Sequence, residues 1–169
     1  DQPRSRGLGD VYKRQVYGES ECLVKIIFND KCFDLKGYID TGNVLKDPYF
    51  KKSVSIVDLE SLNFGGDSIR QLILDDIELN TKVKYHMIPY NSLGCESGML
   101  EVITVDSMYI YTKKKVYAQK NALIGLSTVK LSSDNEFDVL VNIGAVQAEN
   151  CIKKLKFGGC YGFKSCGRR

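Results

Sequence analysis

The chain has little of what most metal and hydrolase sites are built from. It contains one histidine, His86, and its six cysteines form no Cys-x-x-Cys pair. Because zinc sites depend on clustered cysteine and histidine ligands, this composition argues against a metal centre. The chain also lacks a Gly-x-Ser-x-Gly elbow, and no nucleophile motif surrounds the histidine. We therefore expect no metal and no cofactor, a structural role for His86, and neither a serine nor a cysteine hydrolase.

Long apolar runs are also missing, since none approaches the ~18–20 residues that cross a bilayer. Three of the cysteines, Cys22, Cys32 and Cys95, lie in the body of the chain. The first two flank a predicted hairpin and could face each other across it. We expect all three to be reduced, as in a cytoplasmic domain.

The two ends differ from the body. Asp1–Gln15 resembles a translated sequencing adapter, so we exclude it from fold reasoning and expect the native gene to extend upstream. Residues 16–143 are enough for one domain. Residues 144–169 form an uncertain basic tail, rich in cysteine and glycine, for which a frame error and a lineage-specific extension are both open. Of the net charge of +3, Asp1–Gln15 carries +2 and Cys151–Arg169 carries +6, which leaves −5 for Val16–Asn150 and argues against nucleic-acid binding.

Short alternating apolar runs predict an all-β domain with one short helix. The helix is expected over Ser68–Leu74, with Asp67 as its cap. Strands at such close spacing favour a closed barrel. Lys113–Lys115 lies between two predicted strands and is a hairpin turn or, alternatively, a contact for an acidic partner or anionic lipid headgroups. The expected strands are Cys22–Phe28, Cys32–Ile39, Ser53–Val57, Lys82–Pro89, Met99–Val105, Met108–Thr112, Val116–Gln119 and Ala122–Ile124.

One tripeptide indicates a specific chemistry. Asp40-Thr41-Gly42 follows an apolar strand, and an aspartic peptidase needs a carboxylate held on such a turn at the floor of a cleft. Gly42 permits the turn and the approach of a substrate because it has no Cβ. The alternative is an ordinary Asx-type turn after a strand. Leu123, Ile124 and Gly125 favour the peptidase, because in retropepsin-like proteins an apolar-apolar-Gly segment lies beside the catalytic loop.

Acid peptidases use two carboxylates that share one proton, because two like charges so close together cannot both ionise. The chain has only one Asp-Thr-Gly signature and no internal duplication of it. We therefore expect a homodimer in which Asp40 of each copy forms half of the site. Ser92, Leu93, Gly94 and Gly98 lie in a predicted hairpin that is a candidate flap over the cleft, or else an ordinary surface hairpin.

Three segments of the chain resemble the sporulation sigma-E factor processing peptidase family, the SpoIIGA family. They are Tyr38–Pro48, in which Asn43 follows the Asp-Thr-Gly signature, Ile88–Gly94, and Ala122–Leu126 with the following Leu131-Ser132. The resemblance covers roughly Cys22–Leu140 and implies a retropepsin-like aspartic peptidase domain over residues 16–143.

The resemblance also implies a function and a setting. Members remove the N-terminal pro-segment of a sporulation sigma factor, pro-sigma-E, in response to a signalling protein. It implies a membrane-embedded N-terminal region outside this chain and a peptidase domain on the cytoplasmic side of the cell membrane. The alternative is a catalytically silent retropepsin-fold module for dimerisation or binding, although the intact Asp40, Thr41 and Gly42 argue against it.

Overall fold

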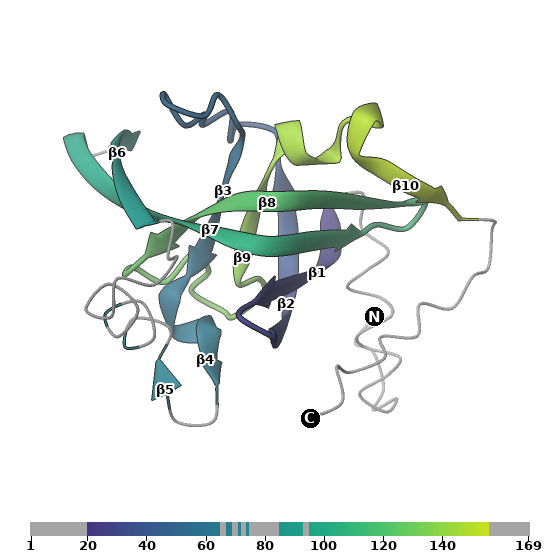
Figure 1. Cartoon of the computed structure of the whole chain (residues 1–169), viewed down its shortest axis with the longest axis horizontal. Helices are drawn as coiled ribbons and strands as arrows, with labels where there is room; N and C mark the ends of the chain where they lie inside the picture. Colours follow the sequence, from purple (N-terminus) through teal and green to yellow (C-terminus); the bar gives the residue numbers. More distant parts are fainter. Residues whose placement is uncertain are drawn as a thin grey trace.

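The computed structural model describes residues 20–64, 67–68, 71, 74, 85–92 and 95–155. Within these residues the chain is mostly β-strand (Figure 1). The adapter-like residues 1–15 and the tail beyond residue 155 lie outside the described residues. In the part of the chain that is described, no helix combines the length and the apolar character needed to cross a membrane.

Ten strands and three 3-10 helices are described. The strands are β1 (Glu21–Phe28), β2 (Lys31–Asp40), β3 (Val54–Asp58), β4 (Asn63–Phe64), β5 (Asp67–Ser68), β6 (Tyr85–Ser92), β7 (Cys95–Tyr111), β8 (Lys115–Ser127), β9 (Val139–Asn142) and β10 (Cys151–Lys154). The short helices are η1 (Leu59–Leu62), η2 (Ile143–Val146) and η3 (Ala148–Asn150). β1 to β3 match their predicted ranges to within one residue at each end.

Six strands close into a barrel in the order β8, β3, β9, β2, β1, β7 and back to β8. The prediction of an all-β closed barrel is therefore confirmed. β2 pairs with β9 and β3 pairs with β8 in parallel, while the other pairs of the ring are antiparallel. β6 extends the sheet beyond β7 and β10 extends it beyond β8, so these two strands project from opposite sides of the barrel in Figure 1.

Alternate residues of neighbouring strands fill the barrel. Val24 lies opposite Ile110, and Ile26 lies opposite Met108, across the β1–β7 pair. All four side chains have an exposed fraction of 0%. Full burial of one such side chain contributes about 1.5–3 kcal/mol to the free energy of folding. These cross-strand pairs set the register, since a slip by one residue would turn every apolar side chain toward solvent.

Two pairs of predicted strands are in fact single long strands. β7 runs through Asp106 and β8 runs through Asn121 without a shift in their register. These polar residues suggested turns, but both are exposed, and the Asp106 carboxylate accepts a hydrogen bond of 2.9 Å from the Asn29 N–H in the β1–β2 turn. Polar side chains at these points therefore face solvent or another turn without ending the strands.

β9 and β10 were not among the predicted strands. β10 lies in the region that the sequence suggests is a tail, and it pairs with β8 from Cys151 to Lys154. The sheet thus includes residues beyond the expected domain boundary at residue 143. The predicted helix is wrong at its start, because Asp67–Ser68 form strand β5, paired with β4. Gln71 and Leu74 are helical, and the rest of the predicted helix lies outside the described residues.

The expected state of the cysteines is correct for one residue and wrong for another. Cys22 is a free, buried thiol, and burial, with a smaller effect from the Glu21 charge, raises its pKa to about 12. Cys32 is disulfide-bonded, contrary to the expectation. The two do not face each other, because Cys22 lies opposite Gly37 and Cys32 lies opposite Ile27 at the other end of the hairpin. The side chain of Cys95 is outside the described residues.

Candidate functional site

Asp40 is the last residue of β2, and the chain turns sharply after it. The Gly42 N–H donates to Asp40 Oδ1 at 2.9 Å, and the Asn43 N–H donates to the Asp40 carbonyl at 3.0 Å. Thr41 and Gly42 are exposed, whereas the Asp40 side chain is partly buried. The carboxylate is thus held by its own turn at the surface of the barrel end, where β2 runs into the β2–β3 loop at the top of Figure 1.

A buried pair of amide side chains fastens this turn to the barrel. Asn142 Nδ2 donates to Asn43 Oδ1 at 3.2 Å, to the Leu45 carbonyl at 2.7 Å and to the Val54 carbonyl at 3.1 Å. Asn43 Nδ2 donates to the Val54 carbonyl at 3.3 Å and to the Leu140 carbonyl at 3.4 Å. Both asparagines are at least nine-tenths buried. Because each amide satisfies several backbone groups, the residues just after Asp40 have one arrangement.

Ser55 and Gly144 complete this network around Asn142. The Asn142 N–H donates to Ser55 Oγ at 3.0 Å, and the Gly144 N–H donates to Asn142 Oδ1 at 2.8 Å. Asn142 thereby also caps η2. All of its polar groups have partners, so its role is to join the ends of β2, β3 and β9.

The strand beside Asp40 is not the one that the sequence suggested. Leu123, Ile124 and Gly125 lie in β8 opposite Val54, Ser55 and Ile56 of β3. The strand that runs parallel to β2 is β9, with Asn142 opposite Asp40. The expectation that residues 122–125 lie beside the Asp40 loop is therefore corrected to Val139–Asn142, followed by Ile143 and Gly144. Asn142 interrupts the apolar run before Gly144, so this segment does not match the apolar-apolar-Gly pattern that residues 123–125 match.

A cleft of about 480 Å³ opens above Asp40. Asp40, Gly42 and Asn43 line it, and its apolar lining includes Val44, Leu45, Ile56 and Leu140. Pro89, Tyr90 and Asn91 of β6 line the same cleft, so the β6–β7 hairpin and the Asp40 turn border one space. A cleft with an apolar wall and one carboxylate is suited to an extended peptide with apolar side chains.

The candidate flap residues belong to this hairpin. Ser92 ends β6, and Gly98 lies opposite Tyr90 in the β6–β7 pair. Leu93 and Gly94, at the predicted tip, lie outside the described residues. Tyr90, the first residue of the predicted hairpin Tyr90–Met99, lines the cleft and packs on the smaller apolar cluster beside it.

His86 is linked to a buried carboxylate. Its Nε2 forms a short hydrogen bond and ion pair with Asp47 Oδ2, while the rings of Tyr49 and Phe50 approach it edge-on at centroid distances of 6.2 and 5.5 Å. Asp47 lies in the loop that leaves the Asp40 turn, and His86 lies in β6. The contact therefore ties the β2–β3 loop to the hairpin that borders the cleft.

The Asp47 carboxylate is ionised more readily than usual. Its burial raises its pKa, but the Phe50 N–H, the His86 side chain and the Tyr49 N–H together outweigh this effect and lower the pKa below its ordinary value of 3.8. The N–H groups of Tyr49 and Phe50 donate to Asp47 Oδ1 at 2.7 and 2.9 Å. The structural role that we expected for His86 agrees with this contact, and its partner was not identified from the sequence.

Among the described residues, no group of three or more histidine, cysteine, aspartate or glutamate side chains is placed to hold a metal ion. The described part of the site therefore offers one carboxylate, Asp40, on a fixed turn in a cleft. A lone carboxylate can act as a general base on water. It cannot also act as its own protonated partner.

A family model described as sporulation factor SpoIIGA matches residues 5–144. A sporulation sigma-E factor-processing peptidase of Bacillus subtilis (strain 168) is 29% identical over 151 residues, covering 81% of this chain and 48% of the relative. A putative sporulation sigma factor-processing peptidase of Bacillus thuringiensis subsp. kurstaki is 31% identical over 130 residues, covering 70% of this chain and 80% of the relative.

The chain thus spans about half the length of the B. subtilis relative. A sporulation sigma-E factor-processing peptidase of Priestia megaterium, 27% identical, is covered over 42% of its length. No solved structure matches the chain. These matches confirm the resemblance that the Asp40 segment and the two later segments indicated.

Replacing Asn142 with Asp tests how this residue holds the turn after Asp40. The substitution keeps the shape but places a carboxylate oxygen where Nδ2 now donates to three acceptors. We expect Asn142→Asp to lower the free energy of unfolding by about 1–3 kcal/mol, and by more where the carboxylate stays ionised. Urea unfolding measures this change. Asn135→Asp, at an exposed turn, is the matched control, and equal stability of both variants would contradict the role of Asn142.

The Asp47–His86 contact predicts a pH-dependent contribution to stability. Because the folded pKa of Asp47 is lowered, its contribution is present above its ordinary value of 3.8 and is lost as the pH falls through the lower folded pKa. Asp47→Asn should cost about 1.5–3 kcal/mol at pH 5. The difference from the wild type should shrink between pH 4 and the folded pKa. Urea unfolding at several pH values gives both results, with Asp134→Asn as the exposed control. A difference that does not change below pH 4 would exclude this linkage.

Proposed function

The chain belongs to the sporulation factor SpoIIGA family, and from this premise we propose that it is an aspartic endopeptidase. One observation carries the proposal. Asp40 lies on a turn held by its own hydrogen bonds and by the Asn43–Asn142 pair, and it lines a cleft bordered by a β-hairpin. This is the arrangement that peptide hydrolysis by carboxylates needs, because the base is fixed and the hairpin can exclude water.

The second carboxylate comes from Asp40 of the partner subunit. Two such groups a few ångströms apart share one proton. The ionised one removes a proton from a water molecule, which attacks the scissile carbonyl carbon, while the protonated one donates a hydrogen bond to the carbonyl oxygen. The proton then passes to the leaving nitrogen, and the C–N bond breaks. The roles belong to the pair, and neither copy can perform them alone.

The exposed residues of the turn support this assembly. Thr41 and Gly42 lie at the surface of a single copy, and Val44, next to the cleft, has an exposed fraction of 68%. A two-fold axis beside the turn would bring the two Asp40 carboxylates together and cover these residues. The Thr41 hydroxyl would then reach the backbone of the facing loop, and hairpins from both copies would border one substrate.

The substrate that we propose is the precursor of a sporulation sigma factor, pro-sigma-E, from which the peptidase removes the N-terminal pro-segment. This comes from the names of the relatives in B. subtilis and P. megaterium, which are sigma-E factor-processing peptidases. By the same likeness we propose that segments outside this chain hold the protein at the cell membrane, with the peptidase domain on the cytoplasmic side, and that a signalling protein activates it.

A second candidate function is a catalytically silent module that keeps the barrel for dimerisation or binding. It shares the fold and the two-fold contact with the peptidase, so the shape of the barrel does not separate the two. The two functions differ in that only the peptidase needs the Asp40 carboxylate.

Asp40→Asn separates these candidates. The amide keeps the shape of the turn but removes the base, so cleavage of a co-expressed pro-sigma-E factor should fall at least about 10²-fold. The wild-type rate should also fall at low pH, where both carboxylates are protonated, and at high pH, where both are ionised. Gel analysis of the precursor measures processing. Asp30→Asn, in the β1–β2 turn, is the control and should process normally. Normal processing by Asp40→Asn would show that Asp40 is not the catalytic base, whereas a wild type that leaves the precursor uncut would favour the silent module.

Mixing tests whether two copies share one site. At concentrations where the dimer is saturated, a ninefold excess of Asp40→Asn chains should reduce activity per wild-type chain about tenfold, because most wild-type chains then sit in dimers with one carboxylate. Diluting the wild type alone should lower its specific activity, since the soluble domain lacks confinement at a membrane. A shared site would be ruled out if the activity per wild-type chain changed neither on dilution nor on addition of the inactive chains.

A further inference from the structure

A second cavity, of about 410 Å³, lies beside the Asp40 cleft and is rich in lysine. Lys46, Lys51, Lys52 and Lys120 line it, and Glu149 is the acidic residue among its lining side chains. Lys46 also lines the Asp40 cleft, so the two spaces meet at this residue. We call the second cavity the lysine groove. Its positive charge contrasts with the rest of the domain, because residues 16–150 together carry a net charge of −5.

The loop that carries three of these lysines is well fastened. The Asp47 N–H donates to the Lys52 carbonyl and the Lys51 N–H donates to the Asp47 carbonyl, both at 2.9 Å. Lys46 and Ser53 form an isolated β-bridge, and Lys51 has a left-handed backbone with φ of 58°. The lysine side chains therefore extend from a loop whose backbone is held in place. This order reduces the entropy lost when a ligand binds.

The acidic residue of this loop does not neutralise them. Asp47 is fully buried, and its carboxylate is used by the N–H groups of Tyr49 and Phe50 and by His86. The Lys46, Lys51 and Lys52 side chains are exposed. Asp47 therefore does not neutralise the groove, in which four lysines face one carboxylate, Glu149, among the lining residues.

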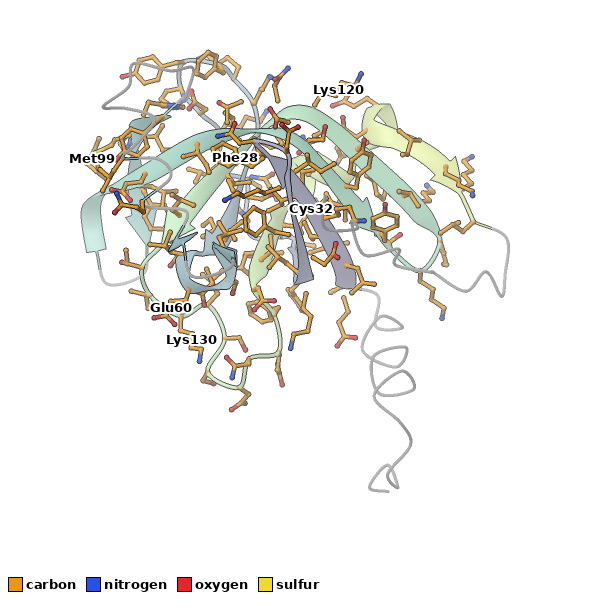
Figure 2. The ribbon with its side chains drawn as sticks, turned by 60° about the horizontal axis from the view of Figure 1, so that its bottom comes forward. Phe28, Cys32, Glu60, Met99, Lys120 and Lys130 are labelled. Carbon is orange, nitrogen blue, oxygen red and sulfur yellow. The ribbon has the colours of Figure 1, made fainter. Side chains whose placement is uncertain are left out.

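β8 forms the facing wall of the groove. Lys52 Nζ donates to the Asn121 carbonyl at 3.3 Å, which joins the loop to β8. Lys120, the residue before Asn121, is exposed and projects outward at the upper edge of the molecule in Figure 2, well away from Met99 at the free end of the hairpin. Both walls of the groove therefore present lysine.

We propose that the lysine groove binds an acidic segment of the protein substrate, next to the residues held in the Asp40 cleft. The inference rests on the proposed peptidase function. A cavity of about 480 Å³ is roughly 8 Å across and holds about two or three extended residues at ~3.4 Å per residue. A peptide that leaves this cleft past Lys46 enters the groove with its residues about three to six positions from the scissile bond.

Lysine charges at an exposed site contribute more to substrate specificity and to the rate of association than to affinity. Each exposed lysine–carboxylate pair should change affinity about two- to fivefold, and several pairs together should change it by more than tenfold. The preference should weaken as salt is added, because exposed charges are screened over about 10 Å at 0.1 M. A substrate lacking acidic residues at these positions should therefore be cut more slowly, mainly through a higher KM.

The experiment uses the full chain and three labelled peptides. The peptides share one pro-sigma-E processing sequence and carry Glu, Gln or Lys at positions three to six from the scissile bond, on either side in separate sets. Fluorescence anisotropy with the Asp40→Asn chain gives Kd, and cleavage by the wild type gives kcat and KM. We expect Glu peptides to bind best and Lys peptides worst.

A charge-reversed variant and a matched control localise the effect. Lys51→Glu, Lys52→Glu and Lys120→Glu together should invert the order, so that Lys peptides bind best. Lys113→Glu, Lys114→Glu and Lys130→Glu change the same charge elsewhere, with Lys130 on the side opposite Lys120 in Figure 2, and should leave the order unchanged. An order that survives reversal of the groove, or that the control also inverts, would overturn the proposal.

Two further outcomes separate this proposal from others. If the groove variant loses binding to phosphatidylserine vesicles but keeps the peptide preference, the lysines face a lipid surface and the proposal is wrong. If Asp40-dependent cleavage occurs with no preference for charge, the groove proposal fails while the peptidase function stands. If the Asp40→Asn chain prefers Glu peptides but the wild type cuts none of them, the peptidase function fails while the groove stands.

Discussion

The buried hydrogen bonds between Asn43 and Asn142 are the contact on which the arrangement of the site depends. They join the ends of two parallel strands, β2 and β9, at the point where the chain turns after Asp40. An amide suits this position because it carries both donors and an acceptor, whereas a carboxylate has no donor and a hydroxyl is too short to serve three carbonyls. The core of the barrel is largely apolar, so this polar pair is costly unless every group is satisfied. The Asn142 amide is satisfied by Asn43, Leu45, Val54 and Gly144.

The loop between β2 and β3 connects the parts of the site. Val44 and Leu45 form a wall of the cleft, Asp47 ties the loop to His86 in β6, and Lys51 and Lys52 border the lysine groove. The cleft, the Asp47–His86 contact and the lysine groove are therefore linked through one short, hydrogen-bonded piece of backbone. The same loop contacts the hairpin that borders the cleft and lines the lysine groove.

The sequence predicted the barrel, its first three strands and the position of Asp40, because alternating apolar residues and a signature tripeptide are local signals. It did not predict β9 as the partner of β2, because parallel pairing joins segments far apart and leaves no local pattern. The preference for residues 123–125 followed from the same limit, since an apolar-apolar-Gly match carries no information about which strand it meets. The Asp47–His86 contact was missed for this reason too, and the polar Asp106 and Asn121 suggested turns in strands that continue.

Parallel pairing of β2 with β9 also sets when the site can form. Asn43 and Asn142 are 99 positions apart in the chain, so the turn after Asp40 is not joined to β9 until Asn142 has been synthesised. At ~5–20 residues per second, that interval is roughly 5–20 seconds on the ribosome. Contacts of such high sequence separation also slow folding after release. The nascent chain therefore carries Asp40 early, but the Asn142 contacts that hold the residues after it form only once β9 is in place.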